Sequence, residues 1–273
     1  MSWLHLVALG AAGLASMTAF PDGMRSAIEA GDVDEAIRQG QLAGPANVER
    51  GLAAPERAIR LAAIAAAPSV EGRAELLVAL ADAAAGPDRR SAIPAAISAR
   101  AIARELQRAA ERDELSDDHA AADLVAWRDA WSRSANDRER WIELRVIALD
   151  VTAALDAAIA GARAREGQPD VTADLGVPLA EALSDPDPAF RRAAVNVVPV
   201  PTPAALRDVL AQTVIGDADP LVALAAAQAL CADLVADPPA PILDALGEPG
   251  LARIRALVKL DDAPVRDARR CLR

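Results

Sequence analysis

Short runs of apolar residues recur along the chain at the spacing of one helix face, and several begin directly behind an acidic residue and a proline. Behind Asp187-Pro188 the apolar positions are Phe190, Ala194, Val195 and Val198. Behind Asp219-Pro220 they are Val222, Ala226, Ala229 and Leu230. An aspartate here accepts a backbone N–H at a helix start, and proline is tolerated in the first turn. The pattern predicts short, capped, amphipathic helices, and no segment is predicted to be a strand.

These helix starts repeat at a fixed interval. Asp187 and Asp219 lie 32 residues apart, and Glu56 and Asp88 in the first half are separated by the same distance along the chain. A second helix is predicted behind each start, for example over residues 203–215. Because one helix pair cannot bury its apolar face alone, we expect the pairs to stack into a solenoid.

Two of the helix starts carry a more specific motif. They are Asp187-Pro188-Ala189-Phe190-Arg191 and Asp262-Ala263-Pro264-Val265-Arg266. Both resemble the D-P-x-V-R opening of HEAT repeats of the short, bacterial, lyase-like type. The resemblance implies an all-α fold, an α-α superhelix of HEAT-like helix pairs, with a polar ladder between the acidic residue of one repeat and the arginine of another. The ladder residues implied in this way are Asp187, Arg191, Asp219, Asp262 and Arg266, although Ala223 stands where the Asp219 unit would carry its arginine.

The middle of the chain departs from this regularity. Helices are predicted over residues 117–132 and 137–160, and Gly, Pro, Gln and Asp accumulate behind them. The expected organisation is an N-terminal HEAT-like half over residues 24–160, a linker or long loop over residues 161–177, and C-terminal HEAT-like repeats over residues 178–273.

The first twenty residues have a character of their own. From Ser2 to Phe20 there is no Lys, Arg, Asp or Glu, and the sequence Met17-Thr18-Ala19 provides a small-residue ending before the chain turns polar. This segment is interpreted as a signal peptide, or alternatively as an apolar first helix of the stack. We expect export, to the periplasm or beyond, with a cytoplasmic location as the alternative and membrane association only if the N-terminus stays uncleaved.

Composition and charge limit the packing and the partners. Hydrophobic residues make up 53% of the chain but aromatic residues only 2%, so helices must approach closely through small aliphatic side chains. The net charge of -11 opposes binding to phosphate backbones, and no nucleic-acid partner is expected.

The two cysteines, Cys231 and Cys271, match no metal-ligand spacing. They are interpreted as two small buried apolar residues, with a disulfide between them as the alternative.

Two groups of side chains in the middle are candidates for binding a partner. The first is a tryptophan group, Trp127, Trp131 and Trp141, since aromatic residues anchor interfaces well. The alternative is that these large residues fill the irregular join between the two halves.

The second candidate is the arginine row on one helix, Arg100, Arg104 and Arg108, which could receive an acidic segment. The alternative is a solvated face balanced by neighbouring acids such as Glu105 and Glu111.

Catalytic chemistry finds little support. His119 stands near Asp117, Asp118 and Asp123, but a lone histidine is a poor metal candidate and the aspartates suit a helix start. No catalytic residue, cofactor or metal site is therefore assigned. The favoured function is a non-catalytic scaffold that binds an unidentified protein partner. The alternatives are an enzyme on a HEAT-like scaffold, similar to the bilin lyases, and an envelope component tethered by its N-terminus.

Overall fold

The computed structural model describes residues 20–116, 120–167, 179–232, 234, 240–259 and 268–272. Within these ranges the regular structure is helical throughout and contains no strand, as the fold class expected. The α-helices are α2 (Phe20–Glu29), α3 (Val33–Ala43), α4 (Pro45–Leu52), α5 (Arg57–Ala66), α6 (Leu77–Ala85), α7 (Arg89–Glu111), α8 (Ala121–Asn136), α9 (Ile142–Arg165), α11 (Pro188–Asn196), α12 (Ala204–Gly216), α13 (Pro220–Ala232) and α14 (Ala240–Leu257). Three short 3-10 helices complete the set, η1 (Ala67–Ser69), η2 (Arg73–Leu76) and η4 (Ala268–Leu272).

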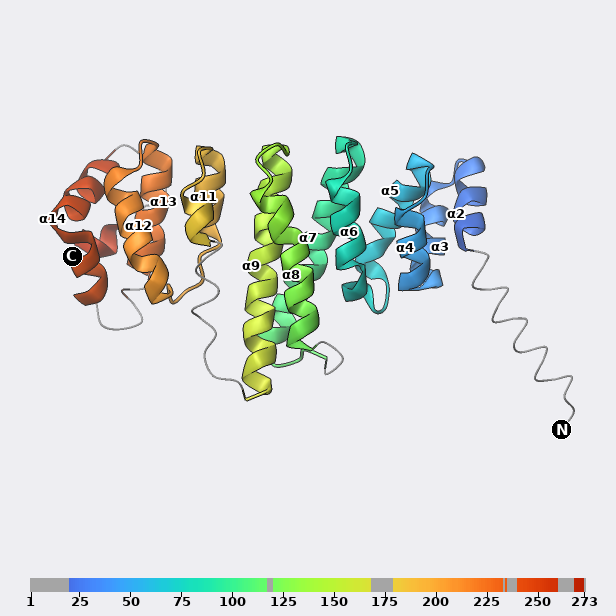
Figure 1. The fold of residues 1–273 in the computed structure, drawn as a ribbon, viewed down its shortest axis with the longest axis horizontal. Helices are drawn as coiled ribbons and strands as arrows, with labels where there is room; N and C mark the ends of the chain where they lie inside the picture. The colour runs from blue at the N-terminus through green and yellow to red at the C-terminus, as the bar shows by residue number, and fades with distance from the viewer. Residues whose placement is uncertain are drawn as a thin grey trace, which may run out of the picture.

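The helices form two layers that run along the long axis of the molecule. In one layer α3, α5, α7, α9, α11 and α13 pack in succession. In the other, α2, α4, α6 and α8 follow one another, and α12 packs on α14. The chain advances steadily from the blue N-terminal end to the red C-terminal end, which is the stacking expected of a solenoid (Figure 1).

Four helices of the first layer, α3, α7, α11 and α13, begin behind an aspartate that caps them. The carboxylates of Asp32, Asp88, Asp187 and Asp219 each accept a hydrogen bond from a backbone N–H two or three residues later, at 2.8 to 3.1 Å. Glu56, which precedes α5, makes no such cap and instead pairs with Arg25 of α2 at 2.9 Å. The recurring acid thus fixes where these helices begin.

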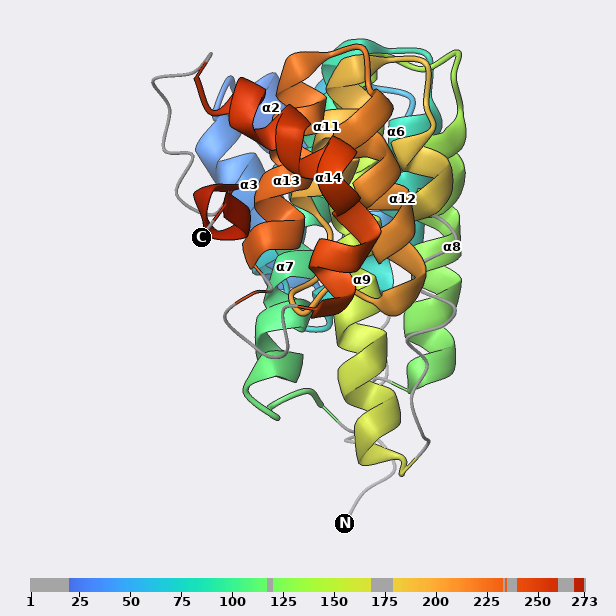
Figure 2. The ribbon, with the colours of Figure 1, turned by 90° about the vertical axis from the view of Figure 1, so that its left-hand side faces the viewer.

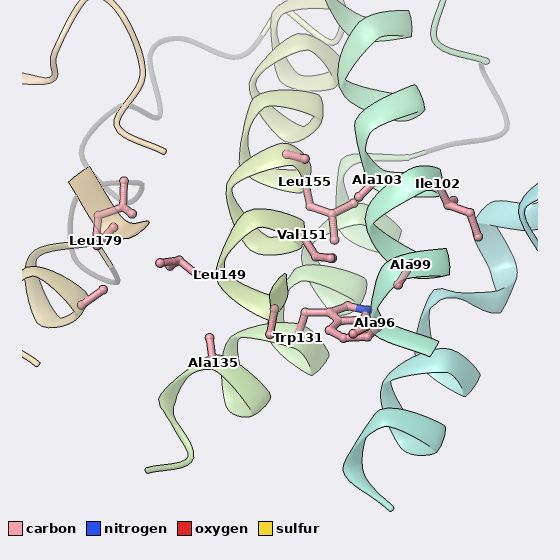
Figure 3. Close-up of a cluster of buried hydrophobic side chains, with 14 of the residues drawn as sticks. Ala96, Ala99, Ile102, Ala103, Trp131, Ala135, Leu149, Val151, Leu155 and Leu179 are labelled. Carbon is pink, nitrogen blue, oxygen red and sulfur yellow. The ribbon is translucent and has the colours of Figure 1, made fainter. Parts of the chain in front are cut away.

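Small side chains let the two longest helices approach closely. Figure 3 shows alanines of α7 beside Val151 and Leu155 of α9. Gly161 of α9 faces Ala110 of α7, and a Cβ at Gly161 would lie only 2.8 Å from that of Ala110. Ala162 beside Gly161 is buried, and α9 continues to Arg165.

The linker expected over residues 161–177 was wrong at its start, because residues 161–165 belong to α9. Residues 168–178 lie outside the described part of the chain. The same holds for residues 1–19, so the leader stays a prediction. The helix expected over residues 117–132 is α8, which starts at Ala121.

The favoured interpretation of the two cysteines was wrong in one respect. Cys231 at the end of α13 and Cys271 in η4 are both buried, as expected, but they form a disulfide with a Cα–Cα distance of 5.5 Å. Sequence spacing could not show this, because the bond depends on η4 folding back onto α13. The disulfide ties the C-terminal end of the solenoid to its preceding helix.

Among the described helices, none combines the length and the apolar character needed to cross a bilayer.

Candidate partner-binding groove

The predicted ladder residue Arg191 joins two successive repeats. Its Nε and Nη2 atoms donate to the two carboxylate oxygens of Asp217, each at 2.8 Å, and Nη1 donates to the carbonyl of Asp185 at 2.8 Å. Asp217 lies in the turn between α12 and α13, directly behind α12, so a side chain of α11 reaches the turn that leads into the next capped helix. The bonds to Asp217 hold the pKa of Arg191 above its ordinary value.

The other predicted members have different roles. Asp187 and Asp219 cap α11 and α13 through their carboxylates and pair with no arginine in the described structure. The arginine is received instead two residues earlier, by Asp217. Asp262 and Arg266, the last predicted pair, lie outside the described residues.

We call each ion pair of this kind between repeats a rung. A second rung, which was not identified from the sequence, lies one repeat before the first. Arg145 of α9 donates through Nη2 to Asp185 at 2.5 Å, and both side chains are buried. Its guanidinium also lies 4.1 Å from the ring centroid of Phe190 in α11, a cation–π contact. Burial opposes ionisation of Asp185, but the bonds from Arg145 and from the Asp187 N–H outweigh it and lower the pKa of this carboxyl. The two rungs thus connect α9, α11 and α13.

The signal for these rungs is the doublet of acidic residues before each helix. In Asp185-Pro186-Asp187-Pro188 the second acid caps the helix, and the first accepts the Asp187 N–H together with the arginine of the preceding repeat. Asp217 and Asp219 repeat this division of roles. Both aspartates in the doublet are therefore needed, each for a different bond.

In the N-terminal half the links between repeats are more exposed. They are Arg25–Glu56 at 2.9 Å, Arg57–Asp88 at 3.4 Å and Arg89–Glu143 at 2.6 Å. Exposed pairs of this kind contribute little to stability, so the buried rungs of the C-terminal half matter more.

The structure does not support the tryptophan group as one binding surface. Trp131 is fully buried among the aliphatic side chains that Figure 3 shows. Its Nε1 donates to the carbonyl of Leu77 at 3.0 Å. Trp127 and Trp141 are partly buried and pack against the same core. Trp131 therefore fills a space between helices within the N-terminal half, and not the join between the two halves that the alternative interpretation gave it.

The arginine row lies on the surface of α7, and α9 supplies its main counter-charge. Arg100 and Arg104 both pair with Asp150 of α9, Arg100 at 3.9 Å. Arg108 makes no ion pair within the described residues, and its Nε donates to the carbonyl of Arg104. Glu105, expected to balance the row, pairs with Arg73 instead. Glu111, the other acid expected to balance the row, lies beside Arg104 and Arg108 and accepts a hydrogen bond from Gln107. Three arginines of the row thus lie near two carboxylates, Asp150 and Glu111.

A hollow of about 540 Å³ adjoins the row. We call it the α9 groove. Its floor is α9 and α7, and its wall is the segment that joins α11 to α12. Its lining residues are Arg104, Gln107, Ala153, Asp156, Ala157, Ala160, Leu179, residues 196–201 and Pro203.

The groove follows from the unequal lengths of neighbouring helices. With 24 residues α9 is roughly 36 Å long, whereas the 9 residues of α11 span about 14 Å. Among the described elements, the short α11 does not cover the side of α9 that carries Ala153, Ala157 and Ala160, and α9 extends beyond α11 and α12 in both views (Figures 1 and 2). Small residues such as Ala153 and Ala157 keep the floor open.

One buried carboxyl lines this hollow. Asp156 is only 7% exposed, and burial raises its pKa to about 6. Arg128 of α8 opposes the shift only weakly, since it lies 3.4 Å from Asp156 and bonds more closely to Asp129, at 2.7 Å. Within the described residues no group of His, Cys, Asp and Glu side chains is arranged to hold a metal ion.

Comparison with known proteins supports the fold alone. No protein-family model matches the chain, and no curated protein matches it. The crystal structure of Kap121p, a HEAT-repeat karyopherin, is similar over 83% of this chain with a TM-score of 0.53 and 20% sequence identity. The chain spans 22% of the length of Kap121p. The fold is thus a HEAT-like helical repeat solenoid.

Proposed function

We propose that this chain is a non-catalytic scaffold that binds an extended segment of a protein partner in the α9 groove. The observation that carries the proposal is the hollow beside Ala153, Ala157 and Ala160 of α9, which is within the size range of ligand sites and lies between two helices and the α11–α12 segment. The HEAT-like solenoid supports a role in protein interaction in general.

The charged groups support a structural rather than a catalytic use. The shifted carboxyls Asp185 and Asp217 lie in the rungs between repeats, and the shifted Asp88 caps α7. Among the described residues that line the hollow, the other polar side chains are Arg104, Gln107 and Asn196, and none of these is a nucleophile. These roles account for the shifts without a reaction.

Export to an oxidising compartment is part of the proposal. The uncharged leader before Pro21 and the disulfide between Cys231 and Cys271 both support it, because disulfides persist mainly outside the cytosol. Fractionation of native cells, with mass spectrometry of the N-terminus, tests it. A cytosolic protein that retains Ser2 would contradict it.

The binding role is tested by filling the groove. Ala157→Trp places a large side chain on the floor, and Ala101→Trp, on an exposed part of α7 outside the groove, is the matched control. Cross-linked partners from native cells should be recovered with the unmodified chain and with Ala101→Trp, and lost with Ala157→Trp. Equal recovery with both folded variants would contradict binding at this place.

A further inference from the structure

This inference rests on the proposed function and names the chemistry of the bound segment. We propose that the α9 groove selects an extended acidic protein segment, which places an aliphatic side chain in the hollow and carboxylates against Arg104 and Arg108.

The apolar and charged parts of the site are continuous. A second hollow of about 410 Å³ is lined by Arg104, Gln107, Arg108 and Glu111, and it shares Arg104 and Gln107 with the α9 groove. Gln107 links the two ends, since its amide accepts from Arg104 and donates to Glu111, each at 2.8 Å. A chain in the groove would pass from the α11–α12 segment onto α7 without leaving the surface.

The α7 end carries more positive than negative charge, because three arginines, Arg100, Arg104 and Arg108, lie near two carboxylates, Asp150 and Glu111. Arg100 and Arg104 share Asp150, and Arg108 has no ion-pair partner among the described residues. The side chain of Arg104 remains 43% exposed. Guanidinium groups bind carboxylates through paired hydrogen bonds, so these arginines can accept acidic side chains without breaking a buried contact.

The molecule as a whole would repel such a segment elsewhere. Its net charge is -11, so an excess of arginine on one face is a local exception. Like charges on the remaining surface disfavour other docking positions, and this contrast gives specificity.

The other end of the groove is apolar and preformed. The wall sequence Val197-Val198-Pro199-Val200-Pro201-Thr202-Pro203 contains three prolines, which restrict the backbone and remove N–H donors. Val200 is 68% exposed, so an aliphatic side chain of the partner would cover it. With so few N–H groups the wall favours side-chain contacts over strand pairing.

The positions of the arginines and of the proline-rich wall set the direction of the bound segment. The aliphatic residue belongs beside the wall of residues 197–203, and the acidic residues belong beside Arg104 and Arg108. Asp156 adds a buried carboxyl to the lining, so the segment needs a residue without negative charge beside it.

Selection from a random twelve-residue peptide library tests the proposal without assuming a sequence. We expect the enriched peptides to carry Asp or Glu within a few positions of Leu, Ile or Val. In fluorescence anisotropy, the double variant Arg104→Glu/Arg108→Glu should weaken binding of an enriched peptide at least tenfold. Arg90→Glu, an exposed arginine near the other end of α7, should change it less than twofold.

The apolar contact is tested in the same assay. Val200→Ser should weaken binding severalfold, and Leu221→Ser, an exposed apolar residue on α13 outside the groove, should have no effect. Both positions are at the surface, so both variants should fold.

The outcomes separate this inference from the proposed function. The library could instead enrich neutral or basic peptides whose binding is lost in Ala157→Trp. That result would contradict an acidic partner but would still support binding in the α9 groove. Peptides that bind regardless of Ala157→Trp, or no enrichment at all, would overturn both. Displacement of an acidic peptide by single-stranded oligothymidylate at equal concentration would show an anion site without selectivity for protein and would also overturn the inference.

Discussion

Arg191 illustrates how one side chain can hold two repeats together. It is largely buried with Asp217, whose pKa is low because bonds from Arg191 and the Asp219 N–H outweigh the effect of burial. Removing the arginine would leave a buried carboxylate without its partner, which is more damaging than losing an exposed ion pair.

We predict that Arg191→Ala destabilises the chain by about 2 to 4 kcal/mol in denaturant unfolding. Arg192→Ala, the exposed neighbour on α11, should change stability by less than about 0.5 kcal/mol. Asp187→Ala removes only a cap and should cost about 1 kcal/mol. Hydrogen exchange should accelerate in the C-terminal half, and equal acceleration in both halves would contradict coupling through this rung.

Asp156 should make stability depend on pH. Its pKa is raised from 3.8 to about 6, so the folded chain binds this proton more tightly than the unfolded chain. Above about pH 6 the ionised Asp156 therefore lowers the free energy of unfolding by its full amount, and this loss of stability disappears as the pH falls towards about 4. At about pH 7.5, Asp156→Asn should be more stable than the parent by up to about 3 kcal/mol.

The comparison needs both ends of the pH range. At about pH 4 the two proteins should have nearly equal unfolding free energies, because both then carry a neutral side chain at this position. The same difference in unfolding free energy between the two proteins at both pH values would show that burial does not raise the pKa of Asp156.

At the scale of helices, the sequence predicted the repeating helix caps, but it did not predict the contacts between helices. Asp187 and Asp219 were predicted as helix starts and occupy them. The partner of Arg191 was missed because it depends on how the repeats are offset, which places Asp217 rather than Asp219 within reach. Periodicity also identified the tryptophans without showing that Trp131 points into the core.

The groove was missed for a related reason. Helical periodicity predicts a long α9, but it does not reveal that α11 is too short to cover it or that residues 196–203 form the opposite wall. Such features arise from the relative placement of elements of different lengths.

The contact between α7 and α9 gives a prediction at this scale. Gly161→Ala would bring a new Cβ against Ala110, and overpacking of this kind costs about 1 to 3 kcal/mol. Gly216→Ala, where a Cβ meets nothing within 4 Å, is the matched control. Adding Ala110→Gly should recover part of the loss. Failure of this second change to help would mean that the two helices are not held in contact at Gly161.

For the whole molecule, stability in a solenoid depends on the contacts of each element with its neighbours. The disulfide closes 40 residues of chain and adds a covalent link between η4 and α13. Replacing both cysteines with alanine should lower stability by an amount on the order of 4 kcal/mol or less in the chain-entropy limit. Unfolding midpoints with and without reductant measure this, and an unchanged midpoint would assign no stabilising role to the bond.

The account as a whole depends on the α9 groove being where a partner binds. Hydrogen exchange on the chain, alone and saturated with the partner captured by it, tests this most directly. We predict added protection at the amides of Val198, Val200 and Thr202 and in the C-terminal halves of α7 and α9, with α2 to α5 unchanged. Protection confined to α2 to α5, or spread evenly along the solenoid, would contradict the account.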